Sequence, residues 1–190
     1  MNQTRNDKIQ VIALLILFSL PIVLAYAGYW LGWFKNVGVA AHGRLLNPVV
    51  TAEDYKFANN QTIESAGKAW KILIYGSGER CDQMCELNVA LAEHVRLALG
   101  KDASRVRLIY VHRGKRSEAF NTGDVKTLAP GVLFWEIVQG PLIPGKIYIM
   151  DPMGNVMLEY DWAPDAKSAP LHGKGMLKDL RKLLKYSHIG

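Results

Sequence analysis

The stretch AWKILIYGSGERCDQMCELNVALAEHVRLALG, residues 69–100, decides the fold. It opens with a short apolar run that predicts a strand, and GSG follows as a turn. From about Cys81 to Leu99, apolar residues recur at a spacing of four, which predicts a helix closed by Gly100. The sequence therefore predicts a strand that leads into a helix, and it places both cysteines of the chain where the helix starts.

The residues after this stretch continue the alternation of strands and helices. RVRLIYVH (105–112) predicts a second strand, and after a polar crossover LAPGVLFWEIVQG (128–140) is interpreted as a short helix. KIYIMD (146–151) and NVMLEYD (155–161) flank an Asp-Pro-Met-Gly turn, which predicts a β-hairpin. Leucines at helical spacing among lysines in residues 173–190 predict an amphipathic C-terminal helix. This order of elements predicts an α/β sandwich.

A membrane segment precedes this domain. The 26 residues from Ile9 to Phe34 carry no charge, whereas a bilayer core needs only about 20. The alternative is a cleaved signal peptide, because Ala25-Tyr26-Ala27 has the small-x-small pattern of a cleavage site. The run is longer than a signal core of about 7 to 15 residues and continues past that site, so we favour an anchor.

The expected organisation is a short tail followed by an anchor, a linker and a domain. The tail covers residues 1–8, the anchor 9–34, the linker with an entry loop or hairpin 35–66, and the folded domain 67–190. Basic residues flank the anchor almost equally on both sides, so they fix its orientation only weakly. With nearly all of the chain after the anchor, we expect a single-pass protein of the inner (cytoplasmic) membrane with its soluble domain on the periplasmic side.

The net charge of +6 is concentrated in the C-terminal helix. Such a helix can pack its leucines on a sheet with its lysines in water, or it can contact anionic lipid or an acidic partner. The sequence has no glycine-rich phosphate loop and no RNA-binding aromatic motif, so no nucleic-acid partner is expected.

Cys81 and Cys85 occupy a position that favours reactive thiols. Free backbone N–H groups and the helix dipole at a helix start stabilise a thiolate and lower its pKa from about 8.5. Positions i and i+4 within a helix have Cβ atoms about 5 to 6 Å apart, whereas a disulfide prefers roughly 3.5 to 4.5 Å. We therefore expect either a reducible bridge that distorts the first turn or a clamp for a metal ion. A structural staple is the third alternative, although a bridge over three residues restrains little of the unfolded chain.

Soft thiolates select Cu(I) or zinc, and two of them leave room for a third ligand or an exchange partner. Met84 lies beside the cysteines and carries a thioether, but a methionine there is more often a core residue.

The combination of an anchor, a CxxxC motif at a helix start and a late Asp-Pro-x-Gly hairpin resembles the Sco/SenC family. The matching residues are Cys81, Cys85 and YIMDPMGNVMLEY (148–160), and the resemblance covers most of the chain from about residue 45. The resemblance implies a thioredoxin-like fold, bound copper and a role in the assembly of cytochrome c oxidase. It also implies an oxidase subunit or its assembly factors as partners.

The sequence departs from the family pattern at three places. Glu86 stands where the family usually has a proline, and Val111-His112-Arg113 replaces its Val-Asp-Pro motif. Ile143 occupies the position of the family's third copper ligand, a histidine. A metal site of Cys81, Cys85 and His112 is the replacement that we predict, because ligands collect at the carboxyl ends of strands in α/β sheets. The cases for the other histidines are weaker: His42, His94, His172 and His188.

The thiols can also act without copper. Pro144 lies close to where thioredoxin-like folds carry a cis-proline beside the active-site cysteines, although it is equally consistent with a plain turn proline. In thiol–disulfide exchange Cys81 would attack and Cys85 would resolve the intermediate.

The prediction is a membrane-anchored, Sco-like assembly factor for cytochrome c oxidase. It would act through Cys81 and Cys85, in copper delivery or in thiol reduction of the copper site. The alternatives are a general extracytoplasmic thiol-disulfide oxidoreductase and a non-catalytic interaction module with a structural disulfide.

Overall fold

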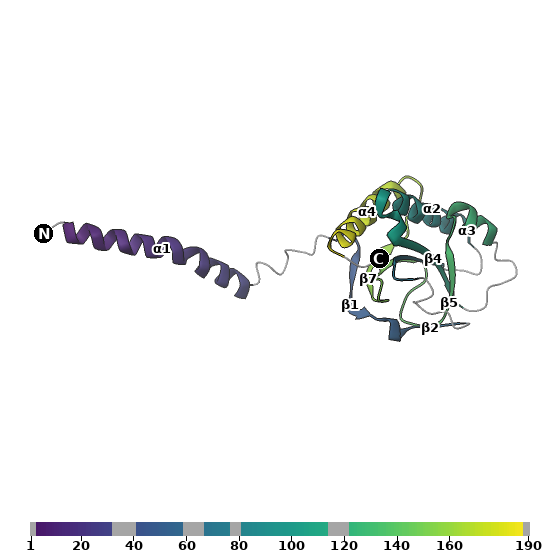
Figure 1. The fold of residues 1–190 in the computed structure, drawn as a ribbon, viewed down its shortest axis with the longest axis horizontal. Helices are drawn as coiled ribbons and strands as arrows, with labels where there is room; N and C mark the ends of the chain where they lie inside the picture. Colours follow the sequence, from purple (N-terminus) through teal and green to yellow (C-terminus); the bar gives the residue numbers. More distant parts are fainter. Residues whose placement is uncertain (1–2, 32–40, 59–66, 77–80, 114–121, 188–190) are drawn as a thin grey trace. The chain divides into compact units, whose positions relative to one another are not determined.

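The structure, a computed structural model, describes residues 3–31, 41–58, 67–76, 81–113 and 122–187. The chain forms two compact units, Met1–Ala40 and Ala41–Gly190 (Figure 1).

The first unit contains helix α1 (Gln3–Trp30). Over Gln10–Gly28 this helix is long and apolar enough to cross a membrane, and its large side chains are exposed there, as lipid contact requires. Pro21 lies inside the helix. The chain therefore fits a single-pass membrane protein, with a helix that already begins within the predicted tail.

The second unit is built on one seven-stranded sheet (Figure 1). Its strands are β1 (Arg44–Val50), β2 (Lys56–Phe57), β3 (Trp70–Tyr75), β4 (Val106–Arg113), β5 (Leu133–Gln139), β6 (Lys146–Met150) and β7 (Val156–Asp161). They lie in the order β1-β7-β6-β3-β4-β5-β2. β3 pairs in parallel with β4, and β4 in parallel with β5, whereas β6 and β7 form the predicted antiparallel hairpin. The central position of β3 explains why its run of residues is fully buried.

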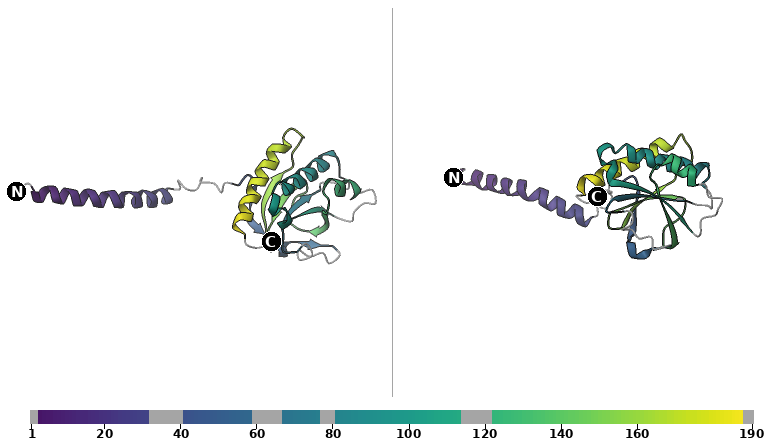
Figure 2. Two further views of the ribbon diagram at one scale, coloured as in Figure 1. Left: turned by 45° about the horizontal axis from the view of Figure 1, so that its top comes forward. Right: turned by 45° about the vertical axis from the view of Figure 1, so that its right-hand side comes forward.

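The helices α2 (Gln83–Leu97), α3 (Thr122–Leu128) and α4 (Ala169–Tyr186) cover one face of this sheet (Figure 2). Two short 3-10 helices, η1 (Ala52–Asp54) and η3 (Gly100–Arg105), complete the elements described. Ile72 and Ile74 of β3 pack towards the helices, and Leu73 and Tyr75 point to the other face, where they join a second apolar cluster. The two faces alternate residue by residue because successive strand side chains point to opposite sides.

α4 is the amphipathic helix that the sequence predicts. Met176, Leu180 and Leu184 are buried in the core, whereas Lys178 and Lys182 are exposed. The predicted packing of its leucines in the core with its lysines exposed is thus confirmed, and contact of these lysines with anionic lipid or an acidic partner stays a prediction.

Two predicted elements differ from the structure. The segment interpreted as a helix over 128–140 forms strand β5, and a helix, α3, lies before it. Trp135 and Ile137 of β5 alternate inwards, and residues 133–137 of β5 pair with β4. A short apolar run fits a buried strand or a helix equally well, and strand pairing decides between them.

The folded unit also begins earlier than the expected boundary at residue 67. β1 pairs with β7 at one edge of the sheet and β2 pairs with β5 at the other. The residues between Ala41 and Ala58 therefore belong to the second unit rather than to a linker.

A buried carboxylate holds the start of this unit against α4. Asp179 is 3% exposed, and it accepts hydrogen bonds from the backbone N–H groups of His42 (2.6 Å) and Gly43 (2.9 Å) and from the Tyr160 hydroxyl (2.8 Å). The His42 ring nitrogen Nδ1 lies 3.2 Å from the other carboxylate oxygen. A buried carboxylate is tolerated only with such partners, so these contacts fix where the chain enters the fold.

Candidate functional site

The two cysteines lie where β3 leads into α2, as predicted, and they form a disulfide with their Cα atoms 5.1 Å apart. α2 begins at Gln83, and Asp82 is its N-cap, with the side chain accepting a hydrogen bond from the Cys85 backbone N–H at 2.9 Å. Cys81 therefore precedes the helix instead of belonging to its first turn. The expectation that a bridge must distort this turn is wrong, because the i, i+4 distance within a helix does not apply to Cys81.

The two sulfur-bearing residues differ in exposure. Cys85 is 2% exposed and belongs to the helix-side core, whereas Cys81 is partly exposed. An incoming thiol or disulfide can therefore approach Cys81, while Cys85 is shielded by its neighbours. This asymmetry makes Cys81 the more accessible residue of the pair and Cys85 the protected one.

Tyr110 contacts the protected sulfur. Its hydroxyl lies 3.5 Å from Cys85 Sγ, and the tyrosine is fully buried in β4. A disulfide sulfur has no hydrogen, so the O–H group donates in this form. Burial, with a smaller contribution from the charge of Asp82, raises the pKa of Tyr110 to about 12. The hydroxyl therefore keeps its proton at neutral pH.

Gly76 leaves the space that this hydroxyl occupies. A Cβ atom at position 76 would lie 2.1 Å from the Tyr110 oxygen, far closer than atoms can approach. The backbone N–H of Gly76 donates to the Val111 carbonyl at 2.9 Å, which holds the end of β3 against β4. A glycine is thus required at position 76 by Tyr110 of the neighbouring strand β4.

Neither Tyr110 nor Gly76 was among the predicted site residues. One sequence feature could have pointed to Tyr110. It lies two residues before His112 in the same strand, so both residues are on one face of the sheet. The contact with Cys85 depends on the pairing of β4 with β3, which the sequence alone does not specify.

His112 lies near the carboxyl end of β4, where it is 8% exposed. Within the described parts of the chain, no three side chains of His, Cys, Asp or Glu are grouped so that they could hold a metal ion. In this disulfide form, Cys81, Cys85 and His112 therefore do not make a ready three-ligand site. Once reduced, the thiols would fit a soft ion such as Cu(I), and the site of Cys81, Cys85 and His112 stays a prediction for that form.

The remaining histidines lie elsewhere. His42 bonds to Asp179 and lines, with His172, a polar cavity of about 730 Å³. His94 lies on α2 along a groove against α4, and His188 falls outside the described residues. Among the described interactions, His42, His94 and His172 thus have no contact with the cysteines.

The segment that precedes β6 lies beside the end of β3. The backbone N–H of Gly145 donates to the Tyr75 carbonyl at 2.8 Å, and Ile143, at the family's histidine position, is 53% exposed. Among the described residues the cis peptide bond is Asn47–Pro48, so the bond before Pro144 is trans. The interpretation of Pro144 as a cis-proline is wrong, and a plain turn proline remains.

A central β3 that leads into a helix start with paired cysteines defines a thioredoxin-like protein. The chain belongs to the family described as transmembrane-like, thioredoxin-like, C-terminal domain, whose model matches residues 70–187. The predicted α/β, thioredoxin-like fold is therefore confirmed.

Several solved structures to which the chain is similar are those of Sco proteins. The apo Sco1 protein of Thermus thermophilus is 16% identical, with a TM-score of 0.53 over 75% of this chain and 96% of that chain. Copper-bound ScoI of Arabidopsis thaliana is 14% identical, with a TM-score of 0.47 over 75% of this chain and 99% of that chain. A SCO1/SenC family lipoprotein of Bacillus anthracis is 9% identical, with a TM-score of 0.46 over 77% of this chain and 96% of that chain. A search of curated proteins found no match.

Proposed function

We propose that this chain is a membrane-anchored, Sco-like thiol–disulfide exchange protein that reduces the oxidised thiols of a copper site during assembly of cytochrome c oxidase. One observation carries the chemistry: the cysteine pair at the start of α2 has one accessible and one buried member, already at bonding distance. The oxidase as destination rests on the resemblance of the Cys81–Cys85 motif and the 148–160 hairpin to the Sco/SenC family.

The exchange proceeds in two substitutions at sulfur. In the reduced protein the Cys81 thiolate attacks one sulfur of a substrate disulfide, forms a mixed disulfide with it and releases the other substrate sulfur as a thiolate. The Cys85 thiol then loses its proton and attacks the Cys81 sulfur. This forms the Cys81–Cys85 bond and releases the second substrate thiolate. Two electrons pass to the substrate, and an external dithiol reductant restores the pair.

The geometry of the helix start supports these roles. The first N–H groups of α2 and the positive end of the helix dipole stabilise negative charge on nearby sulfur. The disulfide of the resting form excludes both sulfurs from binding a metal until reduction. The oxidised thiols that serve as substrate form and persist in an oxidising compartment, which agrees with the expected soluble domain on the periplasmic side of the inner membrane.

Copper delivery is the second candidate function. The observation that favours it is the pair of soft sulfur ligands with their Cα atoms 5.1 Å apart, which reduction would free for Cu(I) as cargo. In this case His112 is the ligand proposed to replace the family's histidine.

The exchange function can be tested by trapping its intermediate. The reduced full-length chain, in detergent, is mixed with the oxidised copper-site domain of a cytochrome c oxidase subunit. Cys85→Ser should accumulate a mixed disulfide through Cys81, whereas Cys81→Ser should accumulate none, because its remaining sulfur is buried. Equal adducts from both variants, or no disulfide transfer from the unmodified chain, would refute the proposed roles.

A titration of the reduced chain with Cu(I) against a competing chelator separates the two candidates. Copper delivery predicts binding that the Cys81→Ser, Cys85→Ser double variant abolishes and that His112→Ala weakens. Binding that is the same in all variants would exclude delivery through this site.

A further inference from the structure

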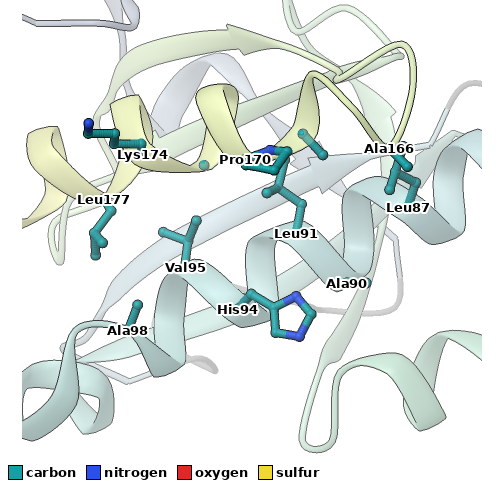
Figure 3. Close-up of a pocket in the computed structure, with 12 residues that line it drawn as sticks. Leu87, Ala90, Leu91, His94, Val95, Ala98, Ala166, Pro170, Lys174 and Leu177 are labelled. Atoms are coloured by element: carbon teal, nitrogen blue, oxygen red, sulfur yellow. The ribbon is translucent and has the colours of Figure 1, made fainter.

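A second feature of the molecule is an apolar groove between α2 and α4. Figure 3 shows Leu91 and Val95 of α2 and Leu177 of α4 pointing into the space between the helices. The groove has a volume of about 460 Å³. Its floor is closed because the helices approach closely at Gly173, where a Cβ atom would lie 2.7 Å from Leu91 Cδ1.

The two walls repeat with the same helical spacing. Its lining residues are Leu87, Ala90, Leu91, His94, Val95 and Ala98 on the α2 side, and Ala166, Ala169, Pro170, Gly173, Lys174 and Leu177 on the α4 side. In both walls the positions follow i, i+3, i+4, i+7, i+8 and i+11, the pattern of a stripe that packs against another helix. The two stripes meet at the bottom of the groove, where Leu91, Val95 and Gly173 are buried, and the partly exposed Leu87, Ala90 and Leu177 line its open part. From Leu87 to Ala98 the stripe runs for about 16 Å, or three helical turns.

The rim of the groove on the α4 side is cationic. Lys174 lines the groove, and Lys178 and Lys182 follow it at i+4 and i+8 on the same side of α4 beyond the lining residues. All three lysines are exposed, and no carboxylate in the described part of the chain forms an ion pair with them. The one acidic residue of α4, Asp179, is buried and bonded to His42, Gly43 and Tyr160. The exposed side of α4 therefore presents positive charge that nothing described in the chain neutralises.

We propose that this groove binds an acidic amphipathic helix of a partner protein. The concave apolar seam accepts a row of large side chains from a third helix, which is the helix-in-groove mode of recognition. The carboxylates of such a helix would meet the lysine rim, and opposite charge across an interface favours both encounter and orientation. A flat lipid surface matches the lysines but not the concavity. The groove starts two residues after Cys85, so a bound partner lies next to the cysteine end of α2.

The probe is a synthetic helical peptide of about three turns, with leucines at i, i+3, i+4 and i+7 and glutamates on both sides of them. Its binding to the full-length chain in nanodiscs of zwitterionic lipid is measured by fluorescence anisotropy. The same peptide with lysines in place of the glutamates is the charge control. The acidic peptide should bind at least tenfold more tightly than the basic one.

Three variants locate the binding. Lys174→Glu with Lys178→Glu reverses the rim and should weaken binding of the acidic peptide at least tenfold, whereas Lys101→Glu, an exposed cation on η3 outside the groove, should leave it unchanged. Ala90→Arg, at a partly exposed wall position, should block the seam without entering the core.

Two outcomes would overturn the proposal. The first is equal binding of the two peptides, or binding that Ala90→Arg leaves intact. The second is hydrogen-exchange protection of the two walls that appears without peptide when phosphatidylserine replaces zwitterionic lipid, since a membrane surface would then be the ligand. Neither result depends on the thiols, so the test stands apart from the exchange function.

Discussion

The Tyr110 hydroxyl lies 3.5 Å from the sulfur of Cys85, the buried member of the disulfide. This contact links β4 to the cysteine pair. The hydroxyl can occupy its place beside the sulfur because position 76, at the end of the paired strand β3, is a glycine without a side chain.

Tyr110→Phe should make the reduction potential of the cysteine pair more negative by about 10 to 30 mV. A thiol or thiolate sulfur accepts a hydrogen bond better than a disulfide sulfur, so the hydroxyl stabilises the reduced form more. A hydrogen bond contributes about 0.5 to 1.5 kcal/mol, and about 1.4 kcal/mol corresponds to 30 mV for a two-electron couple. The measurement is equilibration of the variant with glutathione buffers.

The matched control is Tyr75→Phe. The Tyr75 hydroxyl is buried on the opposite face of the sheet and has no hydrogen-bond partner within the described structure. Its removal should leave the potential unchanged and should not lower the free energy of unfolding. A potential that moves equally in both variants would show that Tyr110 acts through the core and not through the sulfur.

Gly76→Ala should lower the free energy of unfolding by about 1 to 3 kcal/mol, the usual cost of overpacking a core. The added Cβ would lie 2.1 Å from the Tyr110 oxygen and 2.7 Å from its ring carbon Cζ. Combining it with Tyr110→Phe removes the first clash and should restore part of the loss. Urea unfolding, followed by near-UV circular dichroism, measures the cycle, and strictly additive effects would contradict the proposed clash.

Alkaline titration should reveal tyrosines that ionise late. Burial is the main cause that raises the pKa of both Tyr110 and Tyr148 to about 12, from an ordinary value of 10. Because the folded-state pKa is the higher one, their contribution to stability is complete below about pH 10 and is lost as the pH rises through about 12. Absorbance at the tyrosinate band should show a step near pH 12 that decreases in Tyr110→Phe, and an unchanged step would contradict this assignment.

Asp179→Asn should lower the free energy of unfolding by about 1.5 to 3 kcal/mol, the range for hydrogen bonds to a charged group. The three N–H or O–H donors all bond to Oδ2, so an amide oxygen can still accept them, but the charge that strengthens these bonds is lost. An NH2 group also replaces Oδ1, which lies beside His42 Nδ1. Tyr160→Phe removes one of these donors and should cost only about 1 kcal/mol. Thermal and urea unfolding of the two variants give the comparison, and equal losses would argue against a network centred on the carboxylate.

Local patterns were sufficient to predict the centre of the fold. The run 69–75 and the hairpin around Asp151 are each specified by residues close in sequence, and both form as predicted. The start of α2 was placed two residues too early, although Asp82 is a typical N-cap residue and marks the boundary. That displacement produced the wrong expectation of a distorted first turn.

The remaining differences depend on contacts between distant residues. β5 is a strand because it pairs with β4, and β1 joins the sheet because it pairs with β7. Tyr110 becomes part of the site for the same reason, since the pairing of β3 with β4 brings it to Cys85. A residue such as Tyr110, which joins the site only through strand pairing, belongs to no sequence motif and could not be predicted from the sequence.

The most direct test of the account is the reduction potential of the Cys81–Cys85 pair in the full-length chain, measured by equilibration with glutathione buffers and thiol alkylation. An exchange protein requires a bridge that physiological thiols can open, so a value between about −180 and −300 mV is predicted. A potential well below about −300 mV would contradict the proposed function, because the disulfide would then resist reduction by the glutathione pool, as structural bridges do.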